Sequence, residues 1–405
     1  MSSVQFTLDN QLISQDNSFR HAVKFCKFDT GERFVLVTGR KGVAMEETTL
    51  FTMLHQRSRG LSPNTMMAQM RAVALFLDWI ERHGINLTQR IGSGDLFTIE
   101  ELYALRDHFR QHASGKPGVV SGGHFRNRMV WVRDYIEWHA QRVIARIPNA
   151  DWQRAQAYRE RLDHLVRLMS DGLPAARERG REGHPEEVQA IFLDAIRPGS
   201  PSNPFKPRFQ KRNHALLLLY HEHGVRRAEP LKVTGEDLNL HGDMPTVSYR
   251  FGNDEAIDPR VQEGRMKTSP RTLPIGENVL DALKEWIKDR KSFNAKRTPY
   301  VFVTGNGRPL ALQAVNEMFQ LLRARVPGLP ADLTTHHKRH DANDRLTDLS
   351  KDLGWDEGTE QLNRNYMFGW KKTSKQGEKY TKRRTREAAM QASLELQRKS
   401  REDRK

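Results

Sequence analysis

A polar segment divides this chain of 405 residues into two parts. The segment at residues 171–183, DGLPAARERGREG, combines few apolar side chains with glycine and proline. Such a composition is typical of a linker and not of a packed core. A charged helix is expected just before it, at about 151–169. We assign this helix and the polar segment, residues 148–183, to an interdomain linker. The chain is long enough for two or three domains, each with its own core.

Helical periodicity dominates residues 46–147. Ser62 is a predicted N-cap with Pro63 at the first helical position. The apolar residues that follow recur at spacings of three and four, which predicts one buried helix face: Met66, Met70, Val73, Leu77 and Ile80. Further helices are expected at about 98–112 and 124–147. In the last of them we expect Val132, Ile136 and Val143 to point inward and Arg126, Arg128, Arg133 and Arg142 to point outward.

Residues 1–45 are mixed in character, with one predicted strand at Phe34–Val37 between two glycines. This N-terminal part forms either a small β arm or a strand that packs on the helical domain. At the other end, the tail over residues 386–405 is basic and has only a thin apolar stripe. Alone it would be a marginal helix, so we expect it to be disordered or docked on a partner.

The second part, residues 184–385, mixes helices with strands. A helix is expected after Pro185, and Ala215–Tyr220 forms a fully apolar helix core. Two strands and three later helices are predicted at 247–249, 271–275, 277–290, 311–325 and 336–350. This alternation indicates an α+β domain.

The charge and cysteine content restrict the class of protein. The chain has 66 Lys and Arg against 50 Asp and Glu, a formal charge of +16, which favours polyanionic partners. Its one cysteine, Cys26, excludes an intrachain disulfide and a cysteine-based zinc site. No apolar run approaches the roughly 20 residues of a membrane span. We therefore expect a cytoplasmic, nucleoid-associated protein with no membrane segment.

Five short sequence motifs (boxes) follow one another in residues 184–385, and each contains a side chain that can bind or attack a phosphate. They are HGVRRAE with Arg226, MKTSPRTLPI with Lys267, THHKRH with His336 and Arg339, FGW with Trp370, and KYTK with Tyr380. Cationic and neutral donors of these types can stabilise a pentavalent phosphate, and a phenol can attack it. The set therefore predicts cleavage of a DNA phosphodiester without a cofactor or a metal ion.

A metal site is the rival interpretation of the histidines. His336 and His340 are four residues apart on a predicted helix, but no glutamate follows the first histidine as in H-E-x-x-H, and no third ligand is evident. His221 and His223 are two residues apart, on opposite sides of a helix. We therefore expect neither pair to bind a metal ion.

In this order the boxes resemble the tyrosine recombinase (phage integrase) family, over roughly residues 46–385. The family pattern of glycine, apolar residue, catalytic arginine, two residues and glutamate is similar to HGVRRAE, which selects Arg226 over Arg227 and makes Glu229 the supporting acid. The H-x-x-R-H pattern is met by His336, Arg339 and the supporting His340.

Two boxes depart from the family pattern. Trp370 stands where the family usually has histidine and sometimes tryptophan, and an indole N–H can donate a hydrogen bond but cannot transfer a proton. Tyr380 lies ten residues after Trp370, where the family usually has nine. Tyr366 is the rival nucleophile, but it precedes FGW and lacks the Tyr-Thr-basic string of Tyr380.

The resemblance implies a mainly α fold with a small antiparallel β-sheet. Its two domains would be a helical core-binding domain at 46–147 and an α+β catalytic domain at 184–385. It also implies a site-specific recombinase of a mobile genetic element that forms a 3′-phosphotyrosyl link through Tyr380. Its partners would be double-stranded DNA, a homotetramer on that DNA and possible accessory proteins. The alternatives are a non-catalytic DNA-binding accessory protein or repressor, and a type IB topoisomerase.

Overall fold

In this computed structural model the chain forms two compact units. The first contains Met1–Glu178 and Glu255–Gln262, and the second contains Arg179–Asp254 and Glu263–Lys405. Within the first unit, the Arg33 guanidinium donates hydrogen bonds to the carbonyl oxygens of Asp258 (2.7 Å) and Arg260 (2.8 Å). The structure describes residues 21–175, 182–250, 258–262, 268–295, 298–374, 377, 385–386 and 389–395.

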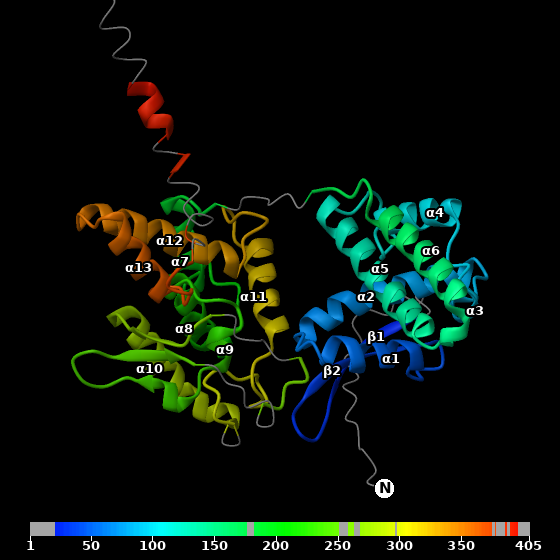
Figure 1. The fold of residues 1–405 in the computed structure, drawn as a ribbon. Helices are drawn as coiled ribbons and strands as arrows, with labels where there is room; N and C mark the ends of the chain where they lie inside the picture. The colour runs from blue at the N-terminus through cyan, green and yellow to red at the C-terminus, as the bar shows by residue number, and fades with distance from the viewer. Residues whose placement is uncertain are drawn as a thin grey trace, which may run out of the picture. The chain divides into compact units, whose positions relative to one another are not determined.

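The first unit is a helical domain with a two-stranded antiparallel sheet (Figure 1). Its elements are β1 (Ala22–Lys27), β2 (Arg33–Thr38), α1 (Glu46–Phe51), the π-helix η1 (Thr52–Arg57), α2 (Pro63–Arg82), α3 (Leu87–Ser93), α4 (Ile99–Arg110), α5 (Gly122–Ile144), the 3-10 helix η2 (Asn149–Asp151) and α6 (Trp152–Ser170). The sheet register pairs Val23 with Val37 and Phe25 with Val35.

Helix α2 is the centre of this unit. As predicted, it begins at Pro63, and the Ser62 hydroxyl accepts a hydrogen bond from the backbone N–H of Thr65. All five residues of the predicted face are buried, but so are Phe76 and Trp79. The helix is enclosed on several sides because α5 and the β1–β2 sheet both pack on it. The N-terminal strand therefore belongs to the domain core.

Helix α6 also belongs to the first unit, although its residues fall within the linker expected at 148–183. Its buried residues Tyr158, Leu162, Leu165 and Met169 join the core of the unit, and α6 packs along α5. The Tyr158 hydroxyl donates a hydrogen bond to the carbonyl oxygen of Ile91 in α3. The first unit thus extends to residue 178, well beyond the expected boundary at 147.

One arginine of α5 lies inside the core, contrary to the expectation that it points outward. Arg128 is only 6% exposed, and its guanidinium donates two hydrogen bonds of 2.7 Å, to the carbonyl oxygens of Phe109 and Gln111. These carbonyls lie at the C-terminal end of α4, where a helix leaves its last oxygens without partners. Arg128 therefore supplies the missing donors.

The second unit combines helices with a small antiparallel sheet of order β3-β4-β5. Its elements are α7 (Glu186–Ile196), α8 (Pro207–His223), α9 (Glu229–Lys232), the 3-10 helix η3 (Gly235–Asp237), β3 (Leu238–Asn239), β4 (Thr246–Tyr249), β5 (Arg271–Pro274), α10 (Glu277–Arg290), the 3-10 helix η4 (Lys291–Phe293), α11 (Leu312–Arg325), α12 (Thr335–Asp352) and α13 (Glu357–Met367). The predicted fold class, mainly α with a small antiparallel sheet, is confirmed.

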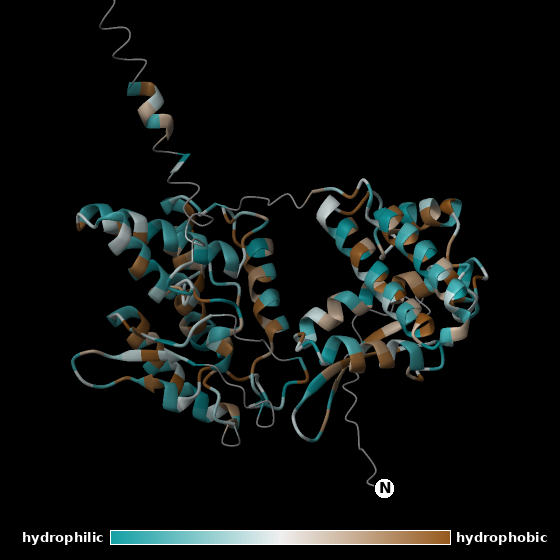
Figure 2. Ribbon diagram, in the orientation of Figure 1, coloured by the Kyte–Doolittle hydropathy of each residue, from teal (hydrophilic) through white to brown (hydrophobic). Residues whose placement is uncertain are grey.

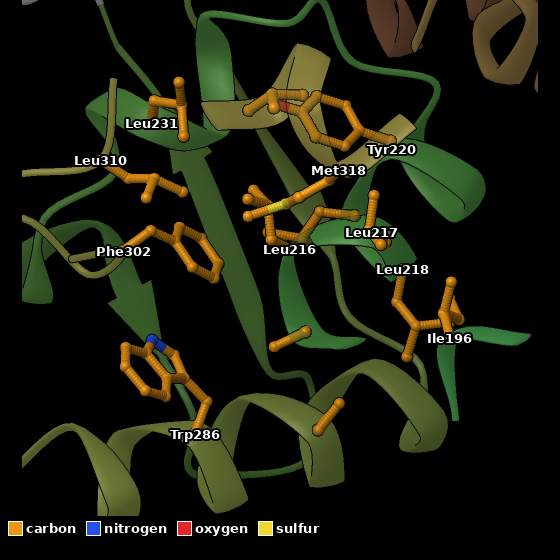
Figure 3. Packing of buried hydrophobic residues seen from close by; sticks show 14 of the residues in the cluster. Ile196, Leu216, Leu217, Leu218, Tyr220, Leu231, Trp286, Phe302, Leu310 and Met318 are labelled. Atoms are coloured by element: carbon orange, nitrogen blue, oxygen red, sulfur yellow. The ribbon is translucent and has the colours of Figure 1, made fainter. Parts of the chain in front are cut away.

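The core of the second unit lies around α8 and α10 (Figure 3). Leu216, Leu217 and Tyr220 of α8 are fully buried, and Trp286 of α10 donates its indole N–H to the carbonyl oxygen of Val301 (3.0 Å). Hydrophobic and hydrophilic residues alternate around the helices of each unit (Figure 2). Within the described residues, no helix is long and apolar enough to cross a membrane.

We predict that Arg128→Ala lowers the free energy of unfolding by about 2–3 kcal/mol, because it leaves one buried and one partly buried carbonyl oxygen without donors. The matched control is Arg126→Ala on the exposed side of the same helix, for which we expect a change within about 0.5 kcal/mol. Urea unfolding followed by circular dichroism measures both. Equal effects of the two substitutions would show that the hydrogen bonds of Arg128 do not matter.

Candidate active site

The arginine box lies on a turn between two helices of the second unit. Helix α8 ends at Gly224, which has a left-handed backbone with φ of 54°. The backbone N–H of Glu229 then donates to the carbonyl oxygen of Arg226 (2.9 Å), which closes the turn before α9. Arg226 is half-buried, whereas the guanidinium of the rival Arg227 donates to the Asn316 side chain on α11 (2.6 Å).

The histidine box forms the first turns of α12. His336 and His340 are one turn apart, and their rings meet edge to face with centroids 5.1 Å apart. His336 is half-buried and His340 is buried. Arg339 lies between them in sequence and is 1% exposed, so its guanidinium faces the interior of the protein.

Arg339 joins three of the predicted boxes. One terminal nitrogen donates to the carbonyl oxygen of Gly224 (2.8 Å), and the other donates to that of Phe368 (2.7 Å). Gly224 caps the C-terminus of α8 and Phe368 caps the C-terminus of α13. The cation therefore lies at two helix C-termini, which carry partial negative charge.

The FGW box ends helix α13 in a Schellman motif. Gly369, with φ of 64°, donates its N–H to the carbonyl oxygen of Tyr366 (3.1 Å), and Trp370 donates its N–H to that of Asn365 (2.8 Å). The indole ring of Trp370 is 7% exposed, and its centroid lies 5.0 Å from the Arg339 guanidinium. Trp370 thus packs against the cation that links the boxes.

The segment after Lys267 is bound to the arginine box. The two carboxylate oxygens of Glu229 accept hydrogen bonds from the Thr268 hydroxyl and from the Arg271 guanidinium, each at 2.6 Å. Arg271 also donates to the carbonyl oxygen of Met367 (2.7 Å). The N–H of Ser269 donates to the carbonyl oxygen of Gly369 (2.8 Å). These contacts bring the arginine, lysine and FGW boxes together.

Lys267 and Tyr380 lie outside the described residues, so their assignments remain predictions. The chain that precedes Tyr380 is described as far as Ser374, and again at Gly377. The Gln361 side chain of α13 donates to the carbonyl oxygen of Ser374 (2.7 Å). Gly377 is buried, and a Cβ there would lie 2.7 Å from the Arg364 Cδ atom. The rival Tyr366 is 58% exposed and donates its hydroxyl to the carbonyl oxygen of Thr272 (3.1 Å).

Sequence reasoning missed a buried ionic group on α12. Lys338 is fully buried; its amine lies 2.8 Å from the Asp341 carboxylate and 4.1 Å from the centre of the Phe192 ring. The N–H of His184 donates to the same carboxylate (2.6 Å). Burial alone would raise the pKa of Asp341, but the hydrogen bond from His184 and the charge of Lys338 hold it well below its usual range. The signal in the sequence was the i, i+3 spacing of Lys338 and Asp341.

The histidines of the predicted boxes do not form a metal cluster in the part of the chain that the structure describes. The groups of three possible ligands found there are His184–Asp332–His337 and His21–Asp78–Glu81. Neither contains His336 or His340. His221 is buried, and burial lowers its pKa to about 2. His223 bonds instead to the Tyr249 hydroxyl (2.9 Å) and the Pro274 carbonyl oxygen (3.0 Å).

Comparison with known proteins relates this chain to one family. Residues 200–392 match the model of the Phage integrase family. Tyrosine recombinase XerC of Chromohalobacter salexigens is 28% identical over 222 residues, which cover 53% of this chain and 66% of that protein, just under two thirds of its length. Tyrosine recombinase XerC of Pseudomonas fluorescens is 25% identical over 304 residues, 74% of this chain and 82% of that protein.

Solved structures of recombinases are also similar to this chain. A lambda integrase tetramer bound to a Holliday junction aligns with 82% of this chain and 74% of its own, at 13% identity and a TM-score of 0.45.

We predict that Gly224→Ala lowers the free energy of unfolding by about 2–4 kcal/mol, since it combines backbone strain with overpacking. A Cβ at residue 224 would lie 2.7 Å from Phe368 and 2.8 Å from Ala342. The control is Gly242→Ala, where φ is 78° but no atom lies within 4 Å, so we expect only the strain, about 1 kcal/mol. Thermal unfolding compares the two. The steric role of Gly224 would be refuted if both variants lost the same amount.

Proposed function

This protein belongs to the phage integrase family of tyrosine recombinases, and on that premise we propose that it cuts and rejoins DNA strands through a 3′-phosphotyrosyl intermediate. The observation that carries the proposal is the meeting of the boxes at Arg339, which binds the carbonyl oxygens of Gly224 and Phe368. Binding to DNA alone needs only generic positive charge. The buried hydrogen bonds of Arg339 connect boxes that are far apart in sequence, and this supports a catalytic site of fixed geometry.

In the proposed cleavage step, the Tyr380 phenol loses its proton to solvent, and its oxygen attacks the scissile phosphorus. A bond forms between this oxygen and phosphorus, and the bond from phosphorus to the 5′ oxygen breaks. Lys267 gives a proton to the leaving oxygen, which becomes a free 5′-hydroxyl. Arg226, which is half-buried, binds the phosphate oxygens directly. His336 donates a hydrogen bond to the phosphate.

The buried residues of the site support this step from within the protein. Arg339 adds positive charge near the phosphate and holds the boxes together, and Trp370 packs on its guanidinium. Glu229 and His340 are supporting residues, the first through its bonds to Thr268 and Arg271 and the second through its contact with His336.

The rejoining step reverses the first with another strand. A second 5′-hydroxyl gives its proton to Lys267 and attacks the phosphotyrosine. A new phosphodiester forms, the bond from phosphorus to the Tyr380 oxygen breaks, and this oxygen takes up a proton from solvent. Because the covalent bond to tyrosine retains the phosphodiester energy, the reaction consumes no ATP. The substrate is double-stranded DNA, which suits the formal charge of +16.

We further propose that the protein acts as a homotetramer on two duplexes and serves a mobile genetic element. The K-T-x-x-R-T-x-P string at Lys267 resembles the phage-integrase form of the box, and this supports the role in a mobile element.

We predict that the wild-type protein forms a covalent adduct with a nicked suicide substrate built from the DNA that flanks its gene, and that Tyr380→Phe forms none. Removing the phenol hydroxyl removes the nucleophile but leaves the ring. A denaturing gel with labelled DNA measures the adduct.

The matched control is Tyr366→Phe, which removes the hydroxyl that bonds to Thr272 and should retain the adduct. An adduct that survives in Tyr380→Phe and disappears in Tyr366→Phe would transfer the nucleophile to Tyr366. If wild type binds the DNA without forming an adduct, the protein is a non-catalytic DNA-binding factor on the same scaffold.

A further inference from the structure

The carboxylate of Glu229 is shared by two donors that follow Lys267 in the chain. Glu229 is 1% exposed, and the Thr268 hydroxyl and the Arg271 guanidinium each bind one of its oxygens at 2.6 Å. Thr268 is 2% exposed and Arg271 is 5% exposed. A buried ion pair of this kind is weak evidence for stability, because desolvation offsets the attraction. Such pairs can instead fix one arrangement of the chain.

The same short segment is also held by the FGW turn. Arg271 donates to the carbonyl oxygen of Met367 (2.7 Å), and the N–H of Ser269 donates to that of Gly369 (2.8 Å). The approach is so close that a Cβ at Gly369 would lie 2.7 Å from the Arg271 guanidinium and 2.8 Å from the Thr268 Cβ atom. On its other side, the Arg271 guanidinium lies 5.0 Å from the centre of the Tyr249 ring. Residues 268–271 are therefore fixed from several directions.

We propose that Thr268 and Arg271 are positioning residues for Lys267, and that they act through the Glu229 carboxylate. Thr268 directly follows Lys267 in sequence, so the two Cα atoms are about 3.8 Å apart by covalent geometry. The residue that directly follows Lys267 is thus bound to the arginine box. A proton donor has to come within about 3 Å of the atom it protonates, and a misplacement of about 1 Å can cost 100-fold in rate.

This inference rests on the proposed function, because it concerns proton transfer from Lys267 to the leaving 5′ oxygen. The experiment compares two suicide substrates that differ at one atom. One has the natural bridging 5′ oxygen, and the other has sulfur in its place. When the phosphorus–sulfur bond breaks, the thiolate leaves without a proton, so a defect that arises only from a misplaced Lys267 disappears with sulfur.

We expect Thr268→Val to cleave the oxygen substrate about 10- to 100-fold more slowly than wild type, and to cleave the sulfur substrate at nearly the wild-type rate. Lys267→Ala should show the same pattern more strongly. Thr268→Ser keeps the hydroxyl and should behave as wild type on both substrates. These rates are measured in single turnover with saturating protein.

The matched control is Thr272→Val on the same strand. The Thr272 hydroxyl lies 2.9 Å from that of Ser248, and the pair is exposed and does not contact Glu229. We expect this variant to cleave both substrates at the wild-type rate. If Thr268→Val does not fold, Thr268→Ala is the second variant. Its smaller side chain leaves room for a water molecule, which can donate to the Glu229 carboxylate in place of the hydroxyl.

The outcomes separate this inference from the proposed function. Equal slowing of Thr268→Val on both substrates would mean that Thr268 supports the fold or another catalytic group, and the inference would be overturned. A wild-type rate on the oxygen substrate would overturn it too. If wild type cleaved neither substrate, the proposed function itself would fail. If Lys267→Ala were slowed equally on both, Lys267 would not be the proton donor, and the inference would fall with that assignment.

Discussion

The organisation of the second unit depends on a buried guanidinium placed where two helices end. A charge that is 1% exposed loses its hydration, and the loss is tolerable only where other groups replace the water. For Arg339 these groups are the capping carbonyls of α8 and α13 and the faces of two aromatic rings, Phe368 and Trp370. The unsatisfied oxygens of two helix ends and the unhydrated cation thus compensate one another. Chain segments more than 100 residues apart in sequence meet at this point.

The helix that carries this cation also buries several other polar side chains. Helix α12 buries Lys338, Asp341, Asn343 and Asp344, which a water-soluble helix would ordinarily expose. Each described link has a definite geometry; for example, Arg364 donates to the Asn343 side chain (3.0 Å) and to the Thr347 hydroxyl (2.9 Å). An apolar contact tolerates sliding, whereas a hydrogen-bonded network allows few alternatives. We infer that this part of the unit is built for a fixed geometry more than for maximal stability.

The sequence predicted the elements whose signals are local or periodic. Helix α2 was found from Ser62 and its apolar spacing, and α10 was placed at the correct residues, 277–290. Helix α13 was missed because its buried residues are Arg364 and Asn365, so apolar periodicity carries no trace of it. Apolar periodicity also does not detect a buried arginine, so it placed Arg128 at the surface. The boxes identified Arg339 by spacing, but its burial at two helix ends depends on tertiary contacts that no local pattern encodes.

The short anchored stretch after Trp370 sets the length of the tether that carries the proposed nucleophile. Counted from the indole, Tyr380 follows after ten residues, one more than the family usually has. The chain is held against α13 well beyond the indole, however, at Ser374 and again at the buried Gly377. Tyr380 is the third residue after Gly377, so the Cα atoms of these two residues can lie at most about 11 Å apart. The tether of the phenol, counted from Gly377, is therefore a few residues long. An extra residue before Gly377 does not lengthen this tether.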